Sequence, residues 1–409
     1  MKNKMSEYSI KEKCKVNTNF ETDTFVGIQC DKGEFSVHFP LGYRLADNDN
    51  ELRKDIIGLL NMIGMTVGRK DSEVDSEGKN FVDTGFPIQS YLAVIRDFYE
   101  RGYYKEREVE YTVSKRGKIN WARTIKTQKP VLQDNEVYYL DFVTKKNSVN
   151  DNELITLIHE YCVYESFEKI GWLFTAYMPS KPRIKFNRKI FVGVVKEKLS
   201  RTFNDKNKEL FINLIRIINQ INDNDAERDY KYGTYRFEYV WEAMIDRVFG
   251  VEDKAKYFPK TTWHIKGHSY DNASLEPDTI MLYKGDVYVL DAKYYKYGAT
   301  KRMDHLPESS SINKQITYGE YVSNNMIKDG EVYNAFIMPF DSKNTKWNTG
   351  DMLAIGDATG DWRDNDKIYE HIQGILVDVK YLMNITVQHD SVEIVKLADC
   401  IASAVKGDC

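Results

Sequence analysis

The chain has 409 residues, of which 58 are Lys or Arg and 62 are Asp or Glu, and its net charge at pH 7 is −4. Hydrophobic residues make up 42% and charged residues 29%, which is typical of folded globular proteins and excludes disorder over most of the length. The length predicts two domains. The charge excludes a protein that coats nucleic acid by bulk charge, but it leaves a local basic groove open.

Several sequence features bear on where the protein works. No stretch reaches the roughly 18 uncharged apolar residues that a membrane span needs, and the polar, lysine-rich start Met1–Phe20 lacks the apolar core of a signal peptide. The five cysteines are odd in number, far apart and never spaced as CxxC, which predicts reduced thiols and neither disulfides nor a zinc knuckle. We therefore expect a cytoplasmic protein with no membrane partner.

The N-terminal part predicts a mixed α+β unit that extends to about Ser180. The expected elements are, in chain order, a β-hairpin at Phe25–Phe39, a helix at Asn50–Met65, an acidic loop at Asp71–Lys79, a helix at Gln89–Arg101, strands at Glu108–Val113 and Glu136–Thr144, and a helix at Asn152–Phe174. A basic turn, Lys115–Lys118, follows the first of these strands.

The middle of the chain is strongly charged. Lys181–Arg201 is the densest basic segment, with Glu197 as its one acidic residue. Such runs are usually solvated, so contact with phosphates and a solvated surface both stay open for it. An amphipathic helix at Leu210–Ile221 and a charged linker at Asn222–Tyr232 follow, and we place the domain boundary near residue 204, which gives domains 1–204 and 205–409.

The C-terminal domain predicts an α/β fold, with helices flanking a short mixed sheet. The expected elements are a helix at Arg236–Phe249, strands at Thr261–Ile265, Asp278–Tyr283 and Val287–Tyr294, a helix at Ser311–Met326, and a strand at Val332–Met338. His264 and His268 flank Lys266 and Gly267, but no third nitrogen or sulfur ligand for zinc is identifiable nearby. A packed or substrate-facing role is the better interpretation of these histidines.

The most informative stretch is the pair of apolar strands joined by Lys284-Gly285-Asp286. In an antiparallel hairpin the start of the first strand lies beside the end of the second, so Asp278 and Asp291 should lie within a few ångströms of each other. Asp291 and Lys293 are two residues apart and therefore point to the same face of their strand.

Two carboxylates held this close repel each other unless one is protonated or a cation lies between them. A hard divalent ion with oxygen ligands resolves the repulsion at neutral pH, so the pair predicts a Mg²⁺ site, with Mn²⁺ as a substitute. Bound Mg²⁺ keeps water ligands and can bind a phosphate oxygen. Lys293 could then orient or deprotonate the attacking water. The alternative interpretation is a surface hairpin with an ion pair.

This pattern resembles the PD-(D/E)xK nucleases, with Pro277-Asp278, twelve intervening residues and Asp291-Ala292-Lys293. The resemblance implies metal binding by Asp278, Asp291 and the Ala292 carbonyl, and a supporting carboxylate from the preceding helix. We prefer Glu242 for that carboxylate, with Glu238 as its competitor. It also implies a role for Gln315, together with Tyr318 on the same helix face, in steadying the site or the DNA backbone.

Further segments resemble the LlaJI family of restriction endonucleases, which is related to the McrC nuclease subunit of McrBC-type systems. They are Val240-Trp241-Glu242, Trp263-His264, Pro277-Asp278, Leu290–Tyr295, Lys314-Gln315 and Asn334–Pro339. Arg116–Trp121 with Arg123-Thr124-Ile125 is similar to an N-terminal segment of McrC-like proteins. The resemblance implies an N-terminal DNA-recognition or partner-binding domain and a C-terminal restriction-endonuclease-like domain that cleaves double-stranded foreign DNA in phage defence.

Three matters stay open at this point. The chain has no GxxxxGK[ST] phosphate loop, so any GTP dependence would come from a McrB-like AAA+ GTPase partner; a homodimer is equally open. A catalytically idle nuclease fold that binds DNA or a partner is the second hypothesis. A junction resolvase, a transposase nuclease subunit or an RNA nuclease is the third.

Overall fold

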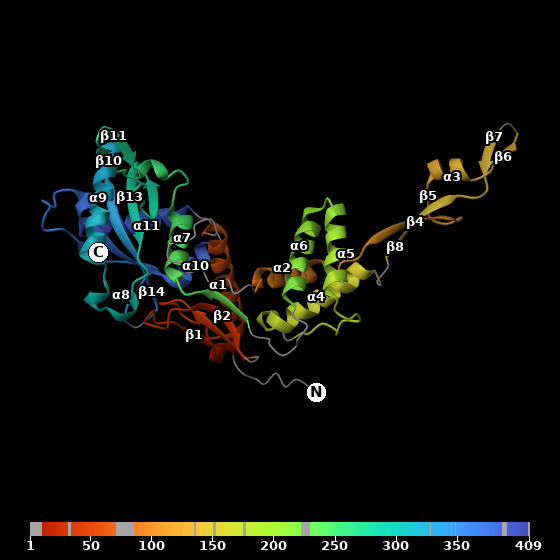
Figure 1. Cartoon of the computed structure of the whole chain (residues 1–409), viewed down its shortest axis with the longest axis horizontal. Coiled ribbons are helices and arrows are strands. Elements are labelled where there is room, and N and C mark those ends of the chain that lie inside the picture. Colours follow the sequence, from red (N-terminus) through yellow and green to blue (C-terminus); the bar gives the residue numbers. More distant parts are fainter. Residues whose placement is uncertain are drawn as a thin grey trace. The chain divides into compact units, whose positions relative to one another are not determined.

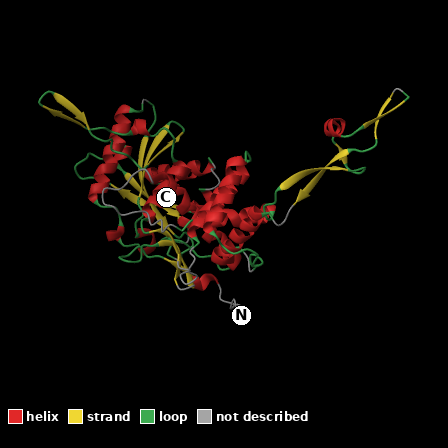
Figure 2. Cartoon of the chain, turned by 45° about the vertical axis from the view of Figure 1, so that its right-hand side comes forward, coloured by secondary structure: helices red, strands yellow, loops and turns green. Residues whose placement is uncertain are grey.

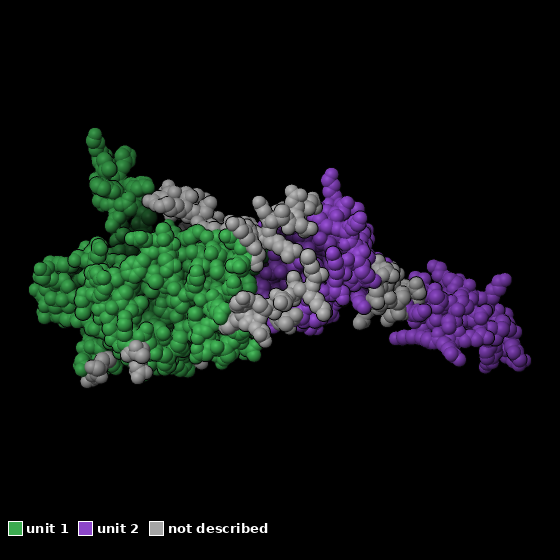
Figure 3. Space-filling model, turned by 90° about the horizontal axis from the view of Figure 1, so that it is seen from below, with its two compact units in different colours: residues 1–86, 227–409 green, residues 87–226 purple. Residues whose placement is uncertain are grey.

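A computed structural model of the chain describes residues 10–31, 34–70, 86–134, 136–149, 153–174, 177–221, 230–327, 329–344, 346–347, 349–386 and 391–407. The chain divides into two compact units: residues 1–86 with 227–409 form unit 1, and residues 87–226 form unit 2 (Figure 3). No described helix is long and apolar enough to cross a membrane. The acidic loop expected at Asp71–Lys79 and most of the linker expected at Asn222–Tyr232 lie outside the described residues.

Unit 1 mixes helices and strands, as predicted for an α/β fold (Figures 1 and 2). Its strands are β1 (Cys14–Val16), β2 (Val26–Asp31), β3 (Glu34–Phe39), β9 (Tyr230–Thr234), β10 (Thr262–Ile265), β11 (His268–Asp271), β12 (Thr279–Tyr283), β13 (Asp286–Ala292), β14 (Val332–Phe340), β15 (Met352–Ala358) and β16 (Ile372–Asp378). Its α-helices are α1 (Asp49–Lys70), α7 (Phe237–Phe249), α8 (Tyr297–Thr300), α9 (Ser309–Asn325), α10 (Val379–Ile385) and α11 (Val392–Lys406).

The central sheet of unit 1 has the strand order β12-β13-β14-β16-β15. The outer pairs, β12 with β13 and β15 with β16, are antiparallel, whereas β13, β14 and β16 run parallel. All residues of β14 are buried, as expected of a central strand covered on both faces. Strand β13 is therefore fixed by hydrogen bonds on both sides, and its C-terminal end is a rigid place to hold side chains.

A second sheet of unit 1 contains strands from both of its chain segments, residues 1–86 and 227–409. Its order is β1-β3-β2-β9, and β2 pairs antiparallel with β9. The ring of Phe86, at the end of the first segment, stacks on Tyr230 at a centroid distance of 4.3 Å. The Leu41 N–H also donates to the Tyr294 hydroxyl at 2.6 Å. Residues 1–86 are thus part of the fold that contains the C-terminal sheet.

This arrangement differs from the predicted division at residue 204 and from the predicted single unit up to Ser180. Unit 2 is an insertion between Phe86 and Glu227, and the boundary helix near residue 204 lies inside it. Local periodicity could not indicate this, because the β2–β9 pairing joins residues about 200 positions apart in the chain and leaves no local mark.

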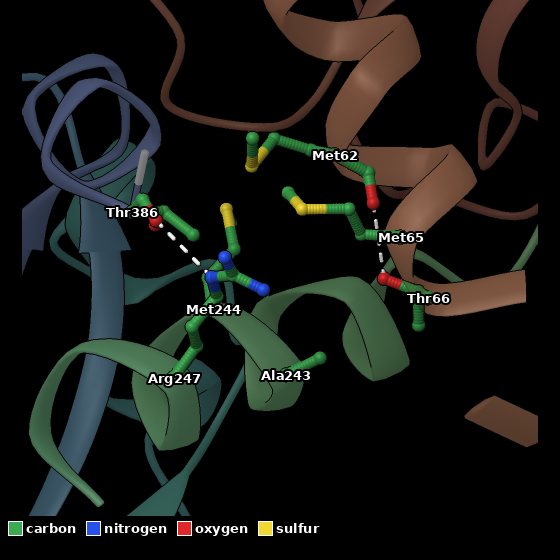
Figure 4. A pocket seen from close by; sticks show the side chains of 7 residues that line it. All are labelled: Met62, Met65, Thr66, Ala243, Met244, Arg247 and Thr386. Carbon is green, nitrogen blue, oxygen red and sulfur yellow. Dashed lines mark hydrogen bonds between the residues drawn. The ribbon is translucent and has the colours of Figure 1, made fainter. Parts of the chain in front are cut away.

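Helix α7 lies between the central sheet and α1. Its apolar residues Phe237, Val240, Trp241, Met244 and Ile245 are buried. On the side toward α1 and α10, Met244 and Arg247 meet Met62 and Met65 (Figure 4). The Arg247 side chain donates to the Thr386 carbonyl at 3.3 Å. Helix α7 is therefore held on several sides, which fixes any side chain that it presents to the sheet.

Unit 2 contains four longer helices and a strand-rich segment. The helices are α2 (Ile88–Arg101), α4 (Leu154–Ile170), α5 (Arg188–Arg201) and α6 (Asp205–Gln220). Residues 107–149, the β-rich segment, contain β4 (Arg107–Val113), β5 (Lys118–Ile119), α3 (Trp121–Thr127), β6 (Pro130–Gln133), β7 (Glu136–Tyr139) and β8 (Val143–Val149). Strands β4, β8 and β5 form one sheet and β6 with β7 a hairpin.

Most predicted elements are confirmed within a few residues, and three differences matter. The strand expected at Glu136–Thr144 is two strands, β7 and β8, that belong to different sheets. Strand β11, which pairs with β10, has no predicted counterpart. Strands β15 and β16 and helices α10 and α11 lie after Met338, where no element was predicted.

The insertion predicts how fragments of the chain behave. Deleting residues 87–226 and joining the ends by a short Gly/Ser linker should leave unit 1 folded, because the Phe86 and Tyr230 rings already touch. Residues 205–409 alone lose the partner strand of β9 and the α1 face that covers α7, so we expect no cooperative unfolding. Thermal melts followed by circular dichroism compare the two, and a cooperative melt of 205–409 would contradict this architecture.

Candidate active site

The β12–β13 hairpin brings the two predicted aspartates together. Its two-residue turn, Lys284-Gly285, has φ values of +52° and +93°. A positive φ at both turn residues is typical of tight two-residue hairpins. Thr279 pairs with Leu290, so Asp278, one residue earlier, lies next to Asp291. The predicted position of both residues is confirmed.

The two carboxyl groups lie within hydrogen-bonding reach of each other. The Asp278 carboxylate also accepts a hydrogen bond from the Ala292 N–H at 2.8 Å, and Asp291 is only 4% exposed. Burial, the charge of Asp291 and the charge of Glu242 together raise the pKa of Asp278 to about 8, although the Ala292 N–H partly offsets them. In the metal-free protein, the pair therefore holds a proton at neutral pH.

Lys293 lies on the same side of β13 as Asp291, as predicted. Its ammonium group is 2.6 Å from the Asp291 carboxylate. The Lys293 backbone N–H donates to the Ile337 carbonyl at 2.9 Å, and the Trp241 indole N–H donates to the same oxygen at 3.0 Å. The Ile337 carbonyl thus fixes both the end of β13 and helix α7 to β14.

Helix α7 carries three acidic residues, Glu238, Glu242 and Asp246. Asp246 pairs with Lys254 at 2.7 Å, which leaves Glu238 and Glu242 as the two predicted candidates. Glu242 is close enough to Asp278 to raise its pKa. Glu238 instead pairs with Arg236 at 2.9 Å. The structure thus favours Glu242, as the sequence analysis preferred, although its role at a metal stays a prediction.

Helix α9 places Gln315 and Lys314 differently. Gln315 is buried, and its amide donates to the Val289 carbonyl of β13 at 2.7 Å and to Asn334 at 3.4 Å. These contacts hold α9 against β13. A direct contact of Gln315 with substrate stays a prediction.

Lys314 lies in a predicted segment but had no assigned role. Burial alone would lower its pKa, but a hydrogen bond to Tyr318 and the charges of Asp291 and Asp278 raise it above the ordinary value. Tyr318 in turn donates to the Glu276 carbonyl at 3.3 Å. Lys314 therefore supplies a second positive charge toward the carboxylates. A lysine directly before Gln315 in an amphipathic helix was the available signal.

The donor set fits Mg²⁺ or Mn²⁺ through its chemistry. Two carboxylates that share a proton can exchange it for a divalent cation, and Mg²⁺ usually takes one or two carboxylates and fills its other positions with water and phosphate oxygens. Among the described residues, no three His, Cys, Asp or Glu side chains converge into a ready-made metal site. Asp278 and Asp291 would hold the ion, and ligation by Glu242 or the Ala292 carbonyl is a further prediction.

Sequence comparisons relate the chain to restriction enzymes. The sequence model described as LlaJI restriction endonuclease matches residues 25–355. Over 256 residues the chain is 27% identical to a Bacillus subtilis (strain 168) protein named Type II restriction enzyme BsuMI component YdjA. That alignment covers 58% of this chain and 55% of the relative, so the chain spans about half the length of the relative that it matches.

A solved structure gives a weaker likeness. It is a refined half-complex from the tetradecameric assembly of Thermococcus gammatolerans McrB AAA+ hexamers with bound McrC. The match has 14% sequence identity, covers 89% of this chain and 82% of the matched chain, and has a TM-score of 0.34. A TM-score of this size does not establish a common arrangement of domains.

The raised pKa of Asp278 predicts a pH dependence of stability. The folded carboxyl titrates at about 8 and the unfolded one at about 3.9, so this group stabilises the metal-free protein fully below pH ~4 and the contribution is lost as pH rises toward 8. In EDTA, the wild-type melting temperature should therefore fall more between pH 5.5 and 8.5 than that of Asp278→Asn.

Added Mg²⁺ should restore the wild-type melting temperature at pH 8.5 and leave Asp278→Asn nearly unchanged. Asp361→Asn, an exposed aspartate in the same unit, is the matched control and should follow the wild type. Parallel pH profiles of the wild type and Asp278→Asn would show that Asp278 carries no proton in the folded state.

Proposed function

The chain belongs to the LlaJI restriction endonuclease family, and we propose that it is a Mg²⁺-dependent endonuclease of the PD-(D/E)xK class. Its proposed substrate is foreign double-stranded DNA, whose phosphodiester bonds it hydrolyses as a restriction enzyme or as the nuclease subunit of a restriction system. A cytoplasmic location remains the expectation for such an enzyme.

One observation carries this proposal. The carboxyl groups of Asp278 and Asp291 lie within hydrogen-bonding reach of each other, and the Lys293 ammonium lies 2.6 Å from Asp291. A buried acidic pair of this kind is costly for folding unless a cation or proton compensates it. The arrangement is better explained by a reaction than by stability.

Each residue of the candidate active site has its own proposed role in the reaction. A bound Mg²⁺ would neutralise charge on the scissile phosphate and lower the pKa of its water ligand. Asp278 and Asp291 hold the ion in place. Lys293 orients the attacking water or takes part in its deprotonation, and Lys314 adds positive charge toward the same point, where negative charge develops in the transition state.

The rival interpretations differ in what they require of these residues. A catalytically idle subunit needs no charged pair at the end of β13, so the presence of Asp278, Asp291 and Lys293 together argues against it. A junction resolvase, a transposase subunit or an RNA nuclease would use the same residues. Branched DNA, duplex DNA and RNA compared as substrates decide among these.

A partner protein is the second part of the proposal. The β-rich segment of unit 2 includes Arg116–Trp121 and Arg123–Ile125, which resemble an N-terminal segment of McrC-like proteins. It exposes several large hydrophobic side chains: Trp121, Ile125, Leu132, Val137, Tyr138 and Leu140. Exposed apolar side chains gathered in one segment indicate a protein interface more than a phosphate-binding surface. We propose that this segment binds a McrB-like AAA+ GTPase, and a homodimer is the alternative.

Replacing Asp291 with Ala tests the nuclease proposal. We expect plasmid cleavage with Mg²⁺ or Mn²⁺ to fall by about 100-fold or more, because the lost carboxylate acts chiefly in the transition state, while the melting temperature and DNA binding change little. Gel assays on methylated and unmethylated plasmid measure this, with Asp361→Ala as the control. Cleavage that survives in Asp291→Ala would refute the mechanism.

A double variant of the β-rich segment tests the partner proposal. Leu132→Asp combined with Leu140→Asp should lower GTP-stimulated cleavage by about 10-fold or more, because a buried unpaired charge opposes an apolar interface, and it should leave the melting temperature unchanged. The assay uses the McrB-like GTPase of the same restriction system. Ile190→Asp, on exposed α5 surface, is the control. Full stimulation of the double variant would exclude this segment as the interface.

A further inference from the structure

The β10–β11 hairpin is a free-standing two-stranded ribbon of unit 1 (Figure 1). Trp263 pairs with Tyr270 across the strands, and Ile265 pairs with His268. The turn residues Lys266 and Gly267 have φ values of +46° and +86°, which again is the geometry of a tight hairpin turn. The ribbon is therefore a defined structure and not a loose loop.

The two faces of the ribbon differ in character. Directly paired residues share a face, so Trp263, Tyr270, Ile265 and His268 lie on one side. Trp263 is 61% exposed, Tyr270 69% and Ile265 57%. Two-stranded hairpins are marginally stable alone, and in the described part of the chain the ribbon forms a sheet of its own. A face with two aromatic rings left in water indicates a binding surface.

The opposite face is polar and already ordered. Thr262 donates to the Asp271 carboxylate at 2.7 Å, and a ring nitrogen of His264 lies 3.0 Å from the Ser269 hydroxyl. These cross-strand contacts engage both His264 and Asp271 within the ribbon.

The base of the ribbon lies beside the candidate active site. The Leu275 N–H donates to the Pro259 carbonyl at 2.8 Å, and Leu275 is three residues before Asp278. The next residue, Glu276, accepts the hydrogen bond from Tyr318, the partner of Lys314. The ribbon thus starts at the same end of the central sheet as the carboxylates.

The positive charge of the ribbon favours a negatively charged partner. Lys260 at its base and Lys266 at its tip are exposed, and the one acidic residue, Asp271, is hydrogen-bonded within the ribbon. Strand β11 has four residues and at about 3.3 Å per residue spans about 13 Å, which is close to the width of a DNA major groove. The major groove, about 12 Å wide, admits a two-stranded β-ribbon.

We propose that the β10–β11 ribbon contacts duplex DNA beside the scissile phosphate, with Lys266 on the backbone and the Trp263–Tyr270 face against sugars and bases. This inference rests on the proposed nuclease function, because it takes the DNA at Asp278 and Asp291 as its starting point. It adds a substrate-binding element to unit 1, separate from the residues that hold the metal.

Binding measured without cleavage tests the ribbon by itself. Fluorescence anisotropy of a labelled duplex with the full chain in EDTA compares the wild type with Trp263→Ala/Tyr270→Ala. We expect about 10- to 100-fold weaker binding, since aromatic contacts with bases are strong. Trp362→Ala, an exposed tryptophan elsewhere in unit 1, should bind like the wild type. Lys266→Gln should reduce the slope of affinity against salt by about 1.

The outcomes separate this inference from the nuclease proposal. Wild-type cleavage together with unchanged binding by the ribbon variants would overturn the ribbon and leave the nuclease standing. DNA binding that depends on the ribbon, in a protein that does not cleave, would support the ribbon and count against the nuclease proposal. Wild-type protein that binds no duplex would overturn the ribbon. A variant that changes only the sedimentation coefficient and not DNA binding would also overturn it, because the ribbon would then be a protein interface.

Discussion

The candidate active site of unit 1 is built around two carboxyl groups that repel each other and that the fold nevertheless holds together. Burial and the charge of Asp291 raise the pKa of Asp278 to about 8, so at neutral pH the metal-free pair does not carry two full negative charges. Around them, the Ala292 N–H, Lys293 and Lys314 each offset part of the negative charge. The Lys254 ammonium also fixes the Asp278 backbone by donating to its carbonyl at 2.6 Å. In the metal-free protein these neighbours and a proton on Asp278 offset the charge of the pair, and a divalent cation could take the place of that proton.

Hydrogen bonds between the surrounding strands and helices keep the two carboxyl groups close together. If the end of β13 could move, the carboxyl groups would separate and become hydrated. The Ile337 carbonyl prevents this by accepting hydrogen bonds from both Lys293 and Trp241. Gln315 and Asn334 form a second polar link inside the core, where the Asn334 amide donates to the Gln315 carbonyl at 3.1 Å. Polar groups buried this way require every partner, which explains why the elements around the site are fixed so closely.

The sequence predicted the site better than the architecture around it. Turn chemistry and strand alternation sufficed to place Asp278 beside Asp291, because the hairpin is local and its register follows from a two-residue turn. The position of Lys314 depends on how α9 packs on β13, which no local pattern contains. The insertion of unit 2 was missed for a related reason: β2 and β9 form one sheet although unit 2 separates them. Strands β15, at the edge of the central sheet, and β16, between β14 and β15, also went unassigned.

The places where the chain departs from stability rules are also the places where we propose function. A buried acidic pair, an uncovered aromatic ribbon and a segment with exposed leucines each cost stability or solubility if the protein is considered alone. The first two lie at one end of the central sheet of unit 1, and the third lies in unit 2. Because unit 2 is inserted between two contacting residues, Phe86 and Tyr230, it can differ in sequence without disturbing the sheet that holds the carboxylates. Under the proposed function, such a fold would allow the nuclease unit to stay constant while the inserted unit adapts to a partner.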